Sequence, residues 1–316
     1  MKKPLILIAG PTASGKTKVS VTLAKQINGA IISADSMQIY KGMDIGTAKV
    51  SKEEADGIVH YMIDELDATT ACNVAWFKEK VKGYIDLIHD QGKVPILVGG
   101  TGFYINAILY DTEFNNMEQN MPYRDYLISL SHNKGAEFLH KMLKEVDADS
   151  AAQIHPNNIK RVIRALEYHH ETGLCISEHN LSERNKKDTN YSPYNYCFFT
   201  LTMERSILYN RINQRVDQMI KDGLVQEVKA FYDEGYDESF TSMKAIGYKE
   251  FFPYFRGEST LDDCIEKLKK NTRNFAKRQL TWFRHQSPSI FIEVDSLSFN
   301  ADKICTLLLN HINKIL

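Results

Sequence analysis

Five apolar runs along the chain predict buried parallel strands, because none alternates polar with apolar positions as a half-exposed strand would. They cover residues 4–10, 29–35, 93–100, 196–203 and 289–294. Apolar residues at helical spacing separate them, as in 16–27 and in 74–92, which ends at a glycine. Strands that alternate with helices predict an α/β fold, with a parallel sheet flanked by helices.

Residues 113–190 follow a different pattern and contain no convincing buried strand. Three segments there have helical periodicity: 118–130, 136–147 and 157–173. A polar stretch, 182–193, is expected to be a linker back to the sheet. We therefore expect a catalytic core made of residues 1–112 and 191–316, interrupted by an all-helical insertion domain of residues 113–190.

A glycine-rich loop, GPTASGKT, lies between the first strand and the first helix and matches the pattern G-x-x-x-x-G-K-[ST] in full. Its glycines let backbone N–H groups converge on an anion, and the helix N-terminus adds partial positive charge. Lys16 supplies a full charge, and the Thr17 hydroxyl is the usual Mg²⁺ ligand. The phosphate-binding residues are thus Gly10, Pro11, Thr12, Ala13, Ser14, Gly15, Lys16 and Thr17. The fold is expected to be P-loop NTPase-like, and whether ATP binds the loop is left open.

An acid is missing where such NTPases usually place one. The strand 93–100 ends in two glycines followed by Thr101, and the acid stands instead at Asp35, after the strand 29–35. Both strand ends should meet at one edge of the sheet, so Asp35 and Thr101 are expected to face the same crevice. Asp35 can serve Mg²⁺, act as a general base or cap the turn that follows, and Thr101 can belong to a tight strand exit.

Five motifs occur in one order along the chain: GPTASGKT (10–17), ISADSMQIYKGMDIGTAK (32–49), ILVGGTGFY (96–104), HPNNIKRVIRALE (155–167) and RNFAKRQLTWFR (273–284). Together they resemble the tRNA dimethylallyltransferase family, from about residue 5 to about residue 285. The resemblance implies transfer of a dimethylallyl group from dimethylallyl diphosphate to N6 of adenosine 37, in the anticodon stem-loop of tRNA. The loop would then hold the donor diphosphate with Mg²⁺.

The resemblance also implies roles for individual residues. Lys16, Asp35 and Thr101 would be catalytic: Asp35 takes the proton of the adenine amine, while Lys16, the loop amides and Mg²⁺ near Thr17 stabilise the leaving diphosphate. Arg211 would reach the diphosphate as an arginine does in a kinase lid. The tRNA contacts would be Asp35, Ser36, Met37, Gln38, Thr101, Arg124, Ile159, Lys160, Arg161, Val162, Ile163, Arg273 and Lys277.

The last motif lies in a predicted basic helix, residues 269–284. Arg273, Lys277 and Arg284 fall on one face of that helix and suit contact with a phosphate backbone. A solvated basic face is the plainer interpretation, and the resemblance favours the first. We expect the adjacent Trp282 and Phe283 to belong to the core.

Three alternative functions remain to be weighed. A small-molecule or nucleotide kinase shares the phosphate loop and the arginine, but the GGTG strand end and the large insertion are against it. An adenylate isopentenyltransferase would prenylate free AMP or ATP, and the insertion and the basic segments are against that. A non-catalytic, RNA-binding NTP switch would need a guanine-reading motif such as NKxD, which is not apparent.

Composition changes this picture little. The 316 residues carry a net charge of −1, so a nucleic-acid surface must be a local patch. The five cysteines form no CxxC pair, which fits reduced thiols. The apolar run 5–9 is too short for a signal peptide and no segment approaches a membrane span, so we expect a cytoplasmic monomer without a membrane partner.

Overall fold

The computed structural model describes residues 2–114, 121–189 and 191–315, which fall into two compact units. One unit combines Met1–Asp111 with Pro193–Leu316, and the other is Thr112–Ser192. The division expected from the sequence, at 113–190, differs by one residue at the first boundary and by two at the second. Residues 118–120 of the first expected insertion helix, and residue 190, lie outside the described residues.

The first unit is built on a six-stranded sheet in which all strand pairs are parallel. Its strands are β1 (Pro4–Ala9), β2 (Gly29–Ala34), β3 (His60–Tyr61), β4 (Val94–Gly99), β5 (Asn195–Thr202) and β6 (Ile290–Glu293), in the order β3-β2-β4-β1-β5-β6. The five strands expected from the apolar runs are all present. The two-residue β3 was not expected, because so short a strand leaves no hydrophobic pattern.

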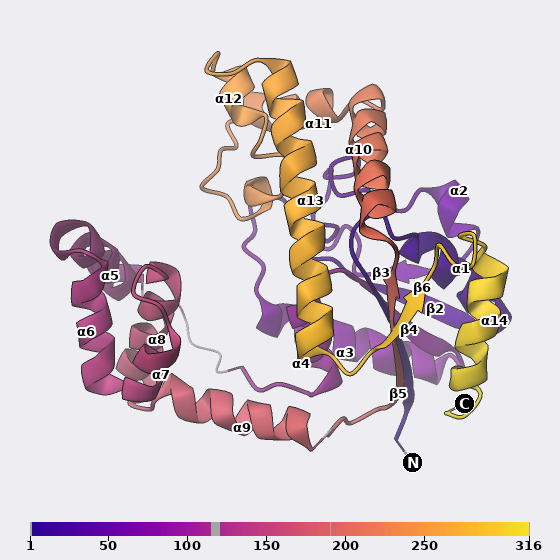
Figure 1. Ribbon diagram of the computed structural model, residues 1–316, viewed down its shortest axis with the longest axis horizontal. Helices are drawn as coiled ribbons and strands as arrows, with labels where there is room; N and C mark the ends of the chain where they lie inside the picture. Colours follow the sequence, from indigo (N-terminus) through magenta and orange to yellow (C-terminus); the bar gives the residue numbers. More distant parts are fainter. Residues whose placement is uncertain (1, 115–120, 190, 316) are drawn as a thin grey trace. The chain divides into compact units, whose positions relative to one another are not determined.

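Helices cover both faces of this sheet (Figure 1). Leu5 and Leu7 of β1 pack into a core shared with α3 (Val74–Asp90), α4 (Gly102–Leu109) and part of α13 (Leu261–Gln286). Ile6 and Ile8 point to the opposite face, where the core includes α1 (Lys16–Gln26), α10 (Arg205–Lys221) and α14 (Ala301–Ile312). All four β1 side chains have no exposed surface. A strand buried on both faces must be apolar at every position, which is why β1 shows no alternation.

Smaller elements complete the first unit: α2 (Lys52–Ala55), α11 (Leu224–Asp233), the 3₁₀ turn η1 (Ser242–Lys244) and α12 (Phe252–Phe255). Tyr248, Phe251 and Phe252 are fully buried and extend the first core toward α11 and α12. Of the helices in the described ranges, none has the length and apolar character that crossing a membrane requires.

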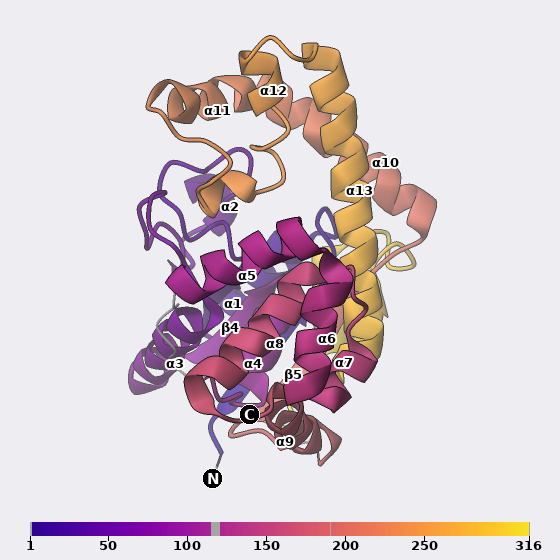
Figure 2. The same ribbon diagram turned by 90° about the vertical axis from the view of Figure 1, so that its left-hand side faces the viewer.

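In its described residues, the second unit contains helices joined by turns and no strand (Figure 2). Its helices are α5 (Met121–Lys134), α6 (Ala136–Val146), α7 (Ala148–Gln153), α8 (Ile159–Thr172) and α9 (Ile176–Asp188). Leu127, Leu139, Leu143, Val162 and Leu166 form its buried core. Each of the three periodic segments therefore forms a helix in its described residues.

The polar stretch expected as a linker at 182–193 is helical as far as Asp188, at the end of α9. That expectation was wrong because it rested on polar composition alone. Lys186 pairs with Glu183 one turn earlier at 2.8 Å and with Glu113 at 3.2 Å. Ion pairs of this spacing help a polar segment to stay helical.

Candidate active site

The register of three neighbouring strands aligns the chemistry at one edge of the sheet. Ala9 of β1 pairs with Gly99 of β4, and Gly99 pairs with Ala34 of β2. The next residues along the three strands are Gly10, Gly100 and Asp35. The phosphate loop, the GGTG turn and the acid therefore emerge side by side, as strand ends in an open α/β sheet should.

The loop after β1 has an open anion-binding geometry. Ala13 and Gly15 have positive φ angles, 64° and 89°, and no side chain caps the start of α1, so its first N–H groups stay available. A Cβ at Gly10 would lie 2.7 Å from the carbonyl oxygen of Leu201, so only glycine fits. The Ser14 hydroxyl is buried without a hydrogen-bond partner in the described structure. A buried hydroxyl left unpaired in such a loop fits a phosphate oxygen as its missing partner.

Charged groups converge on this loop. Lys16 Nζ donates to the carbonyl oxygens of Gly10 and Pro11 at 3.0 and 2.8 Å. Burial, and after it the positive charge of Arg215, lower the pKa of Lys16 to about 8, with the charge of Asp35 opposing both. Burial raises the pKa of the Asp35 carboxyl above its usual value, against the stabilising Met37 N–H group and Lys16. The site is therefore cationic and poorly solvated, which strengthens its attraction for an anion.

Asp35 and Thr101 are neighbours. The backbone N–H of Ser36, directly after Asp35, lies 3.4 Å from the Thr101 hydroxyl oxygen. Asp35 also accepts the Met37 N–H at 2.9 Å, so it does cap the turn after β2, as one interpretation of the sequence held. That bond occupies Oδ1, and a carboxylate has acceptor positions to spare. The capping role therefore leaves the carboxylate able to take a proton.

The side chain of Gln38 is used within the protein. Its Oε1 accepts from the Ser33 hydroxyl at 2.8 Å, and its Nε2 donates to the carbonyl oxygens of Thr47 and Ala48 at 3.1 Å. These bonds hold residues 47–48 against β2. A contact of Gln38 with tRNA stays a prediction, and the structure shows a second, positional use for its amide.

Glu227 of α11 was not singled out from the sequence, although it shapes the same loop. Its carboxylate accepts the N–H groups of Asp44, Ile45 and Gly46 at 2.8–3.0 Å, and the hydroxyl of Tyr248. A Cβ at Gly46 would lie 2.4 Å from the Tyr248 ring. The motif at residues 32–49 was noted in the sequence, but no periodicity reveals that a glutamate more than 180 residues away binds it.

Arg211 reaches the loop from α10. Its Nε donates to the carbonyl oxygen of Ala13 at 3.0 Å, and its guanidinium lies over the ring of Phe299, 4.7 Å from the ring centroid. The structure thus brings Arg211 to the phosphate loop. Contact with a diphosphate stays a prediction.

Helix α13 carries exposed cations on its outer side. Lys277, Arg278 and Arg284 are exposed, whereas Arg273 is half-buried and donates to Asn213 of α10 at 2.6 Å. Phe283 is fully buried, in line with its expected core position. Trp282 is half-buried and lies edge-on to Phe103, with ring centroids 6.3 Å apart. A hollow of about 610 Å³ is lined by Asn274, Lys277, Arg278, Thr281, Trp282, His285 and Gln286.

The predicted tRNA contacts of the helical unit differ in how far their side chains are exposed. Lys160 and Arg161 are exposed at the start of α8, whereas Val162 and Ile163 lie in the core of the unit, and Ile159 is half-buried. The Arg124 guanidinium makes two 2.7 Å bonds to the buried carboxylate of Glu167. The side chains of Val162 and Ile163 therefore pack in the core of this unit. The guanidinium of Arg124 neutralises the carboxylate of Glu167.

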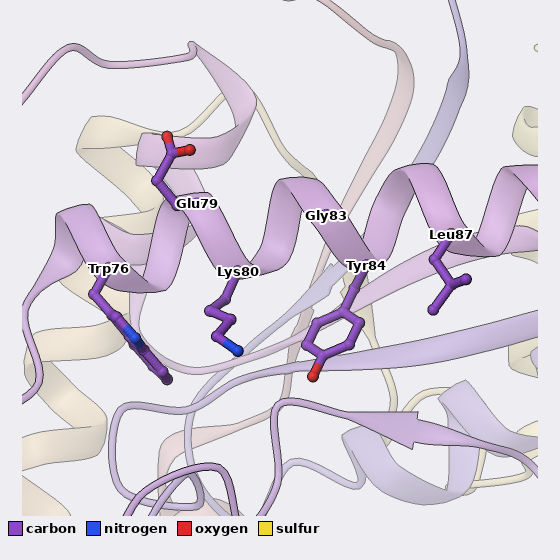
Figure 3. A pocket seen from close by; sticks show the side chains of 6 residues that line it. All are labelled: Trp76, Glu79, Lys80, Gly83, Tyr84 and Leu87. Atoms are coloured by element: carbon purple, nitrogen blue, oxygen red, sulfur yellow. The ribbon is translucent and has the colours of Figure 1, made fainter.

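A second hollow, of about 400 Å³, lies along α3 (Figure 3). Trp76, Lys80, Tyr84 and Leu87 project from one side of that helix, and Glu79 points away. The Tyr84 hydroxyl donates to Glu65, and Lys80 lies 4.0 Å from the same carboxylate. This hollow contains none of the phosphate-loop residues, and its charges largely neutralise one another.

Comparison with known proteins decides the family. Residues 38–286 match the sequence model of the family described as IPP transferase. The tRNA dimethylallyltransferase of Lachnoclostridium phytofermentans is 49% identical over 300 residues, covering 95% of this chain and 94% of the relative. The chain belongs to the IPP transferase family. The enzyme of the same name from Halalkalibacterium halodurans is 46% identical over 300 residues, with the same coverage.

Solved structures of IPP transferases have the same fold. The tRNA isopentenylpyrophosphate transferase of Bacillus halodurans superposes with a TM-score of 0.73 at 42% identity, covering 99% of this chain and 98% of that one. A eukaryotic dimethylallyltransferase acting on tRNA gives a TM-score of 0.77 at 30% identity, covering 94% and 75%. The predictions of family, of the α/β fold with a phosphate loop, and of a prenyl-transferring enzyme rather than a kinase are confirmed.

The donor groups at this IPP transferase site suit a metal held mainly by phosphate. Within the described part of the chain, no three His, Cys, Asp or Glu side chains cluster as a metal cage would. Mg²⁺ keeps water and phosphate ligands and needs only one or two from protein. The half-buried Thr17, at the start of α1, is a hydroxyl ligand that fits a divalent metal arriving with a phosphate group.

The Glu227 contacts predict that Glu227→Gln will loosen the loop at residues 44–46. The amide has one oxygen and no charge, so it cannot satisfy three N–H groups and a hydroxyl as the carboxylate does. Hydrogen exchange at Asp44, Ile45 and Gly46 should speed up by about 10–100-fold. Glu234→Gln, at the exposed end of α11, is the matched control. Unchanged exchange at these three amides would show that Glu227 does not hold the loop.

Proposed function

We propose that this IPP transferase moves the dimethylallyl group of dimethylallyl diphosphate onto N6 of adenosine 37 in tRNA and releases diphosphate. One observation carries the proposal: a phosphate loop and Asp35 emerge from aligned strands, with Thr101 where an NTPase has its acid. The names of its relatives point to the same substrates. A phosphate site beside a lone base suits departure of a diphosphate better than attack on a phosphoryl group.

The reaction forms a carbon–nitrogen bond and breaks a carbon–oxygen bond. The adenine amine attacks C1 of the dimethylallyl group, and the electron pair of the C1–O bond leaves with the diphosphate. An exocyclic adenine amine is a weak nucleophile, so loss of its proton must accompany attack. Asp35 has the free acceptor capacity to take that proton, and Thr101 is adjacent to hold the reacting groups in line.

Negative charge grows on the diphosphate as the bond breaks. Lys16, the N–H groups at the start of α1 and the Ser14 hydroxyl surround the place where that charge develops. Arg211 adds a guanidinium from α10. Bound through the diphosphate and Thr17, Mg²⁺ would supply further positive charge. We infer that Gly10 to Thr17 bind the donor as a unit.

We infer that exposed cations on both units bind the tRNA backbone, including Lys277 on α13 and Lys160 and Arg161 on the helical insertion, residues 113–190. The target base must leave its stack, which costs little in an anticodon loop. Ser36 and Met37, beside Asp35, would then meet the flipped adenosine. A tRNA substrate implies a cytoplasmic enzyme, and the expected monomer stays a prediction.

A label-transfer assay tests the function. Protein, Mg²⁺ and dimethylallyl diphosphate labelled in the prenyl group are mixed with an unmodified anticodon stem-loop, and in parallel with AMP. Label in the RNA alone is expected. Label in AMP would favour an adenylate isopentenyltransferase, and ATP turnover without label in either acceptor would favour a kinase.

Asp35→Asn should lower kcat by about 10²–10⁴-fold without loss of tRNA binding. Asp67→Asn, an exposed surface acid, should behave like the wild type.

The lowered pKa of Lys16 predicts a pH limit for donor use. Lys16 is charged below its pKa of about 8 and neutral above it, so kcat/KM for dimethylallyl diphosphate should fall as pH rises through that value. Lys16→Arg should keep its charge and lose this alkaline limb, even if its activity is lower. Lys18→Arg, the exposed neighbour on α1, should leave the limb in place. An unchanged limb in Lys16→Arg would rule out Lys16 as its source.

The exposed face of α13 predicts a change in salt dependence. Replacing Lys277 and Arg278 together by alanine should weaken tRNA binding and reduce the slope of log K against log salt by about 1.4–1.8, since each lost phosphate contact removes about 0.7–0.9. Lys303→Ala, an exposed cation on α14, is the control. If the double variant kept the wild-type slope, this face would not be part of the tRNA interface.

A further inference from the structure

Gln279 of α13 joins the phosphate loop to the turn that carries Thr101. Its side chain is buried, with 6% of its surface exposed. The amide Oε1 accepts the backbone N–H of Thr12 at 3.1 Å, and Nε2 donates to the carbonyl oxygen of Gly100 at 3.0 Å. One side chain therefore bonds the main chains of the loop after β1 and the turn after β4.

A primary amide makes both contacts while staying neutral at every physiological pH. Its oxygen must accept from an N–H and its nitrogen must donate to a carbonyl, so the two partners fix its orientation. A carboxylate could accept from Thr12 but would face the Gly100 oxygen without a proton to offer. An apolar side chain would leave both main-chain groups unsatisfied in a buried place, which is costly.

The contact with Gln279 also explains why position 100 is a glycine. A Cβ at Gly100 would lie 2.1 Å from Nε2 of Gln279, whereas the next nearest atom of another residue, the Gly10 carbonyl oxygen, would be 3.5 Å away. Gly100 has no positive φ angle that would itself require glycine. The amide of Gln279 therefore accounts for the absence of a side chain at this turn.

The loop is also held at the next residue. Arg211 of α10 binds the carbonyl oxygen of Ala13, directly after Thr12. Helices α10 and α13 are in turn linked by Arg273 to Asn213 at 2.6 Å and by Lys269 to Asp217 at 2.8 Å. Two connected helices thus fix two consecutive residues of the loop, and Gln279 is the one that also reaches the turn after β4.

We propose that Gln279 is a positioning residue for prenyl transfer, which holds the phosphate loop at a fixed distance from Thr101 and Asp35. This inference rests on the proposed function. Gln279 acts through Thr12 and Gly100, while the donor diphosphate and the acceptor base are bound by others. If the loop shifts relative to the turn, the leaving group and the nucleophile lose their alignment. A misplacement of about 1 Å costs on the order of 10²-fold in rate.

The first experiment uses Gln279→Met in the full chain, which keeps the length of the side chain and removes both hydrogen bonds. We expect kcat to fall by about 10²-fold, with KM for tRNA within about 3-fold of the wild type, because a loss of kcat at a nearly unchanged KM indicates lost alignment rather than lost acceptor binding. Inorganic diphosphate with Mg²⁺ should bind about 10-fold more weakly by calorimetry. Gln214→Met, exposed on α10, is the control. Wild-type kcat and diphosphate binding in Gln279→Met would overturn the proposal.

A double-mutant cycle isolates the contact itself. Gly100→Ala should displace the amide and lower kcat about as much as Gln279→Ala does. In Gln279→Ala the obstructing atom is gone, so adding Gly100→Ala should cost nothing further. Losses that multiply in the double variant would show two independent structural effects and would overturn the proposal.

Gln279→Glu gives a pH signature that a purely structural role would not produce. A protonated carboxyl has one donor and one acceptor and so resembles the amide, and burial favours this neutral form. Relative to the wild type at each pH, diphosphate binding by Gln279→Glu should improve as pH falls, while that of Gln279→Met stays low. If the affinity of Gln279→Glu for diphosphate, divided by that of the wild type, stayed constant with pH, the positioning role of Gln279 would be overturned. This measurement decides the question even if Gln279→Met fails to fold.

A failure of the proposed function can be told apart from a failure of the Gln279 proposal. A wild-type protein that binds diphosphate but prenylates neither RNA nor AMP would contradict the proposed function. The binding measurements would still decide whether Gln279 holds the loop.

Discussion

The alignment of β1, β4 and β2 is the constraint on which the site depends. Gly99 lies between Ala9 and Ala34 in the register, and a Cβ on it would come within 2.2 Å of the Ala34 carbonyl oxygen. The absence of that side chain lets the β4 exit run close to the end of β2. A slip of one residue would turn each side chain to the opposite face, and it would separate Asp35 from Thr101. The parallel register thus brings Asp35, Thr101 and the phosphate loop together before any side chain contributes.

The electrostatics follow from what surrounds that edge. Lys16, Arg211 and Arg215 bring positive charge to a loop whose dry surroundings raise the pKa of Asp35 and lower that of Lys16. An anion binds such a site strongly because few waters compete with it. In the proposed reaction, this site would stabilise the departing diphosphate and leave the single carboxylate to take a proton. This arrangement distinguishes the IPP transferase site from that of an NTPase, where the corresponding acid serves a metal.

Side chains distant in sequence hold the loops of this structure in place. Glu227 gathers three backbone N–H groups of the loop after β2, and Gln279 bonds the phosphate loop to the turn after β4. In the helical unit, Arg124 neutralises the buried Glu167. Buried polar groups of this kind must be satisfied, so each of these residues fixes the path of the chain around it.

The sequence by itself determined the local features: the phosphate loop, the five long strands, the three main insertion helices and the acid at Asp35. Each leaves a pattern within about twenty residues, because backbone propensity and burial act locally. Only the tertiary structure decided that Glu227, Gln279 and Arg124 are held by partners 43 to 267 residues away, that Val162 and Ile163 are core, and that 182–188 is helical. A hydrogen bond between distant main-chain and side-chain atoms has no periodicity to read, since it exists only once the chain has folded.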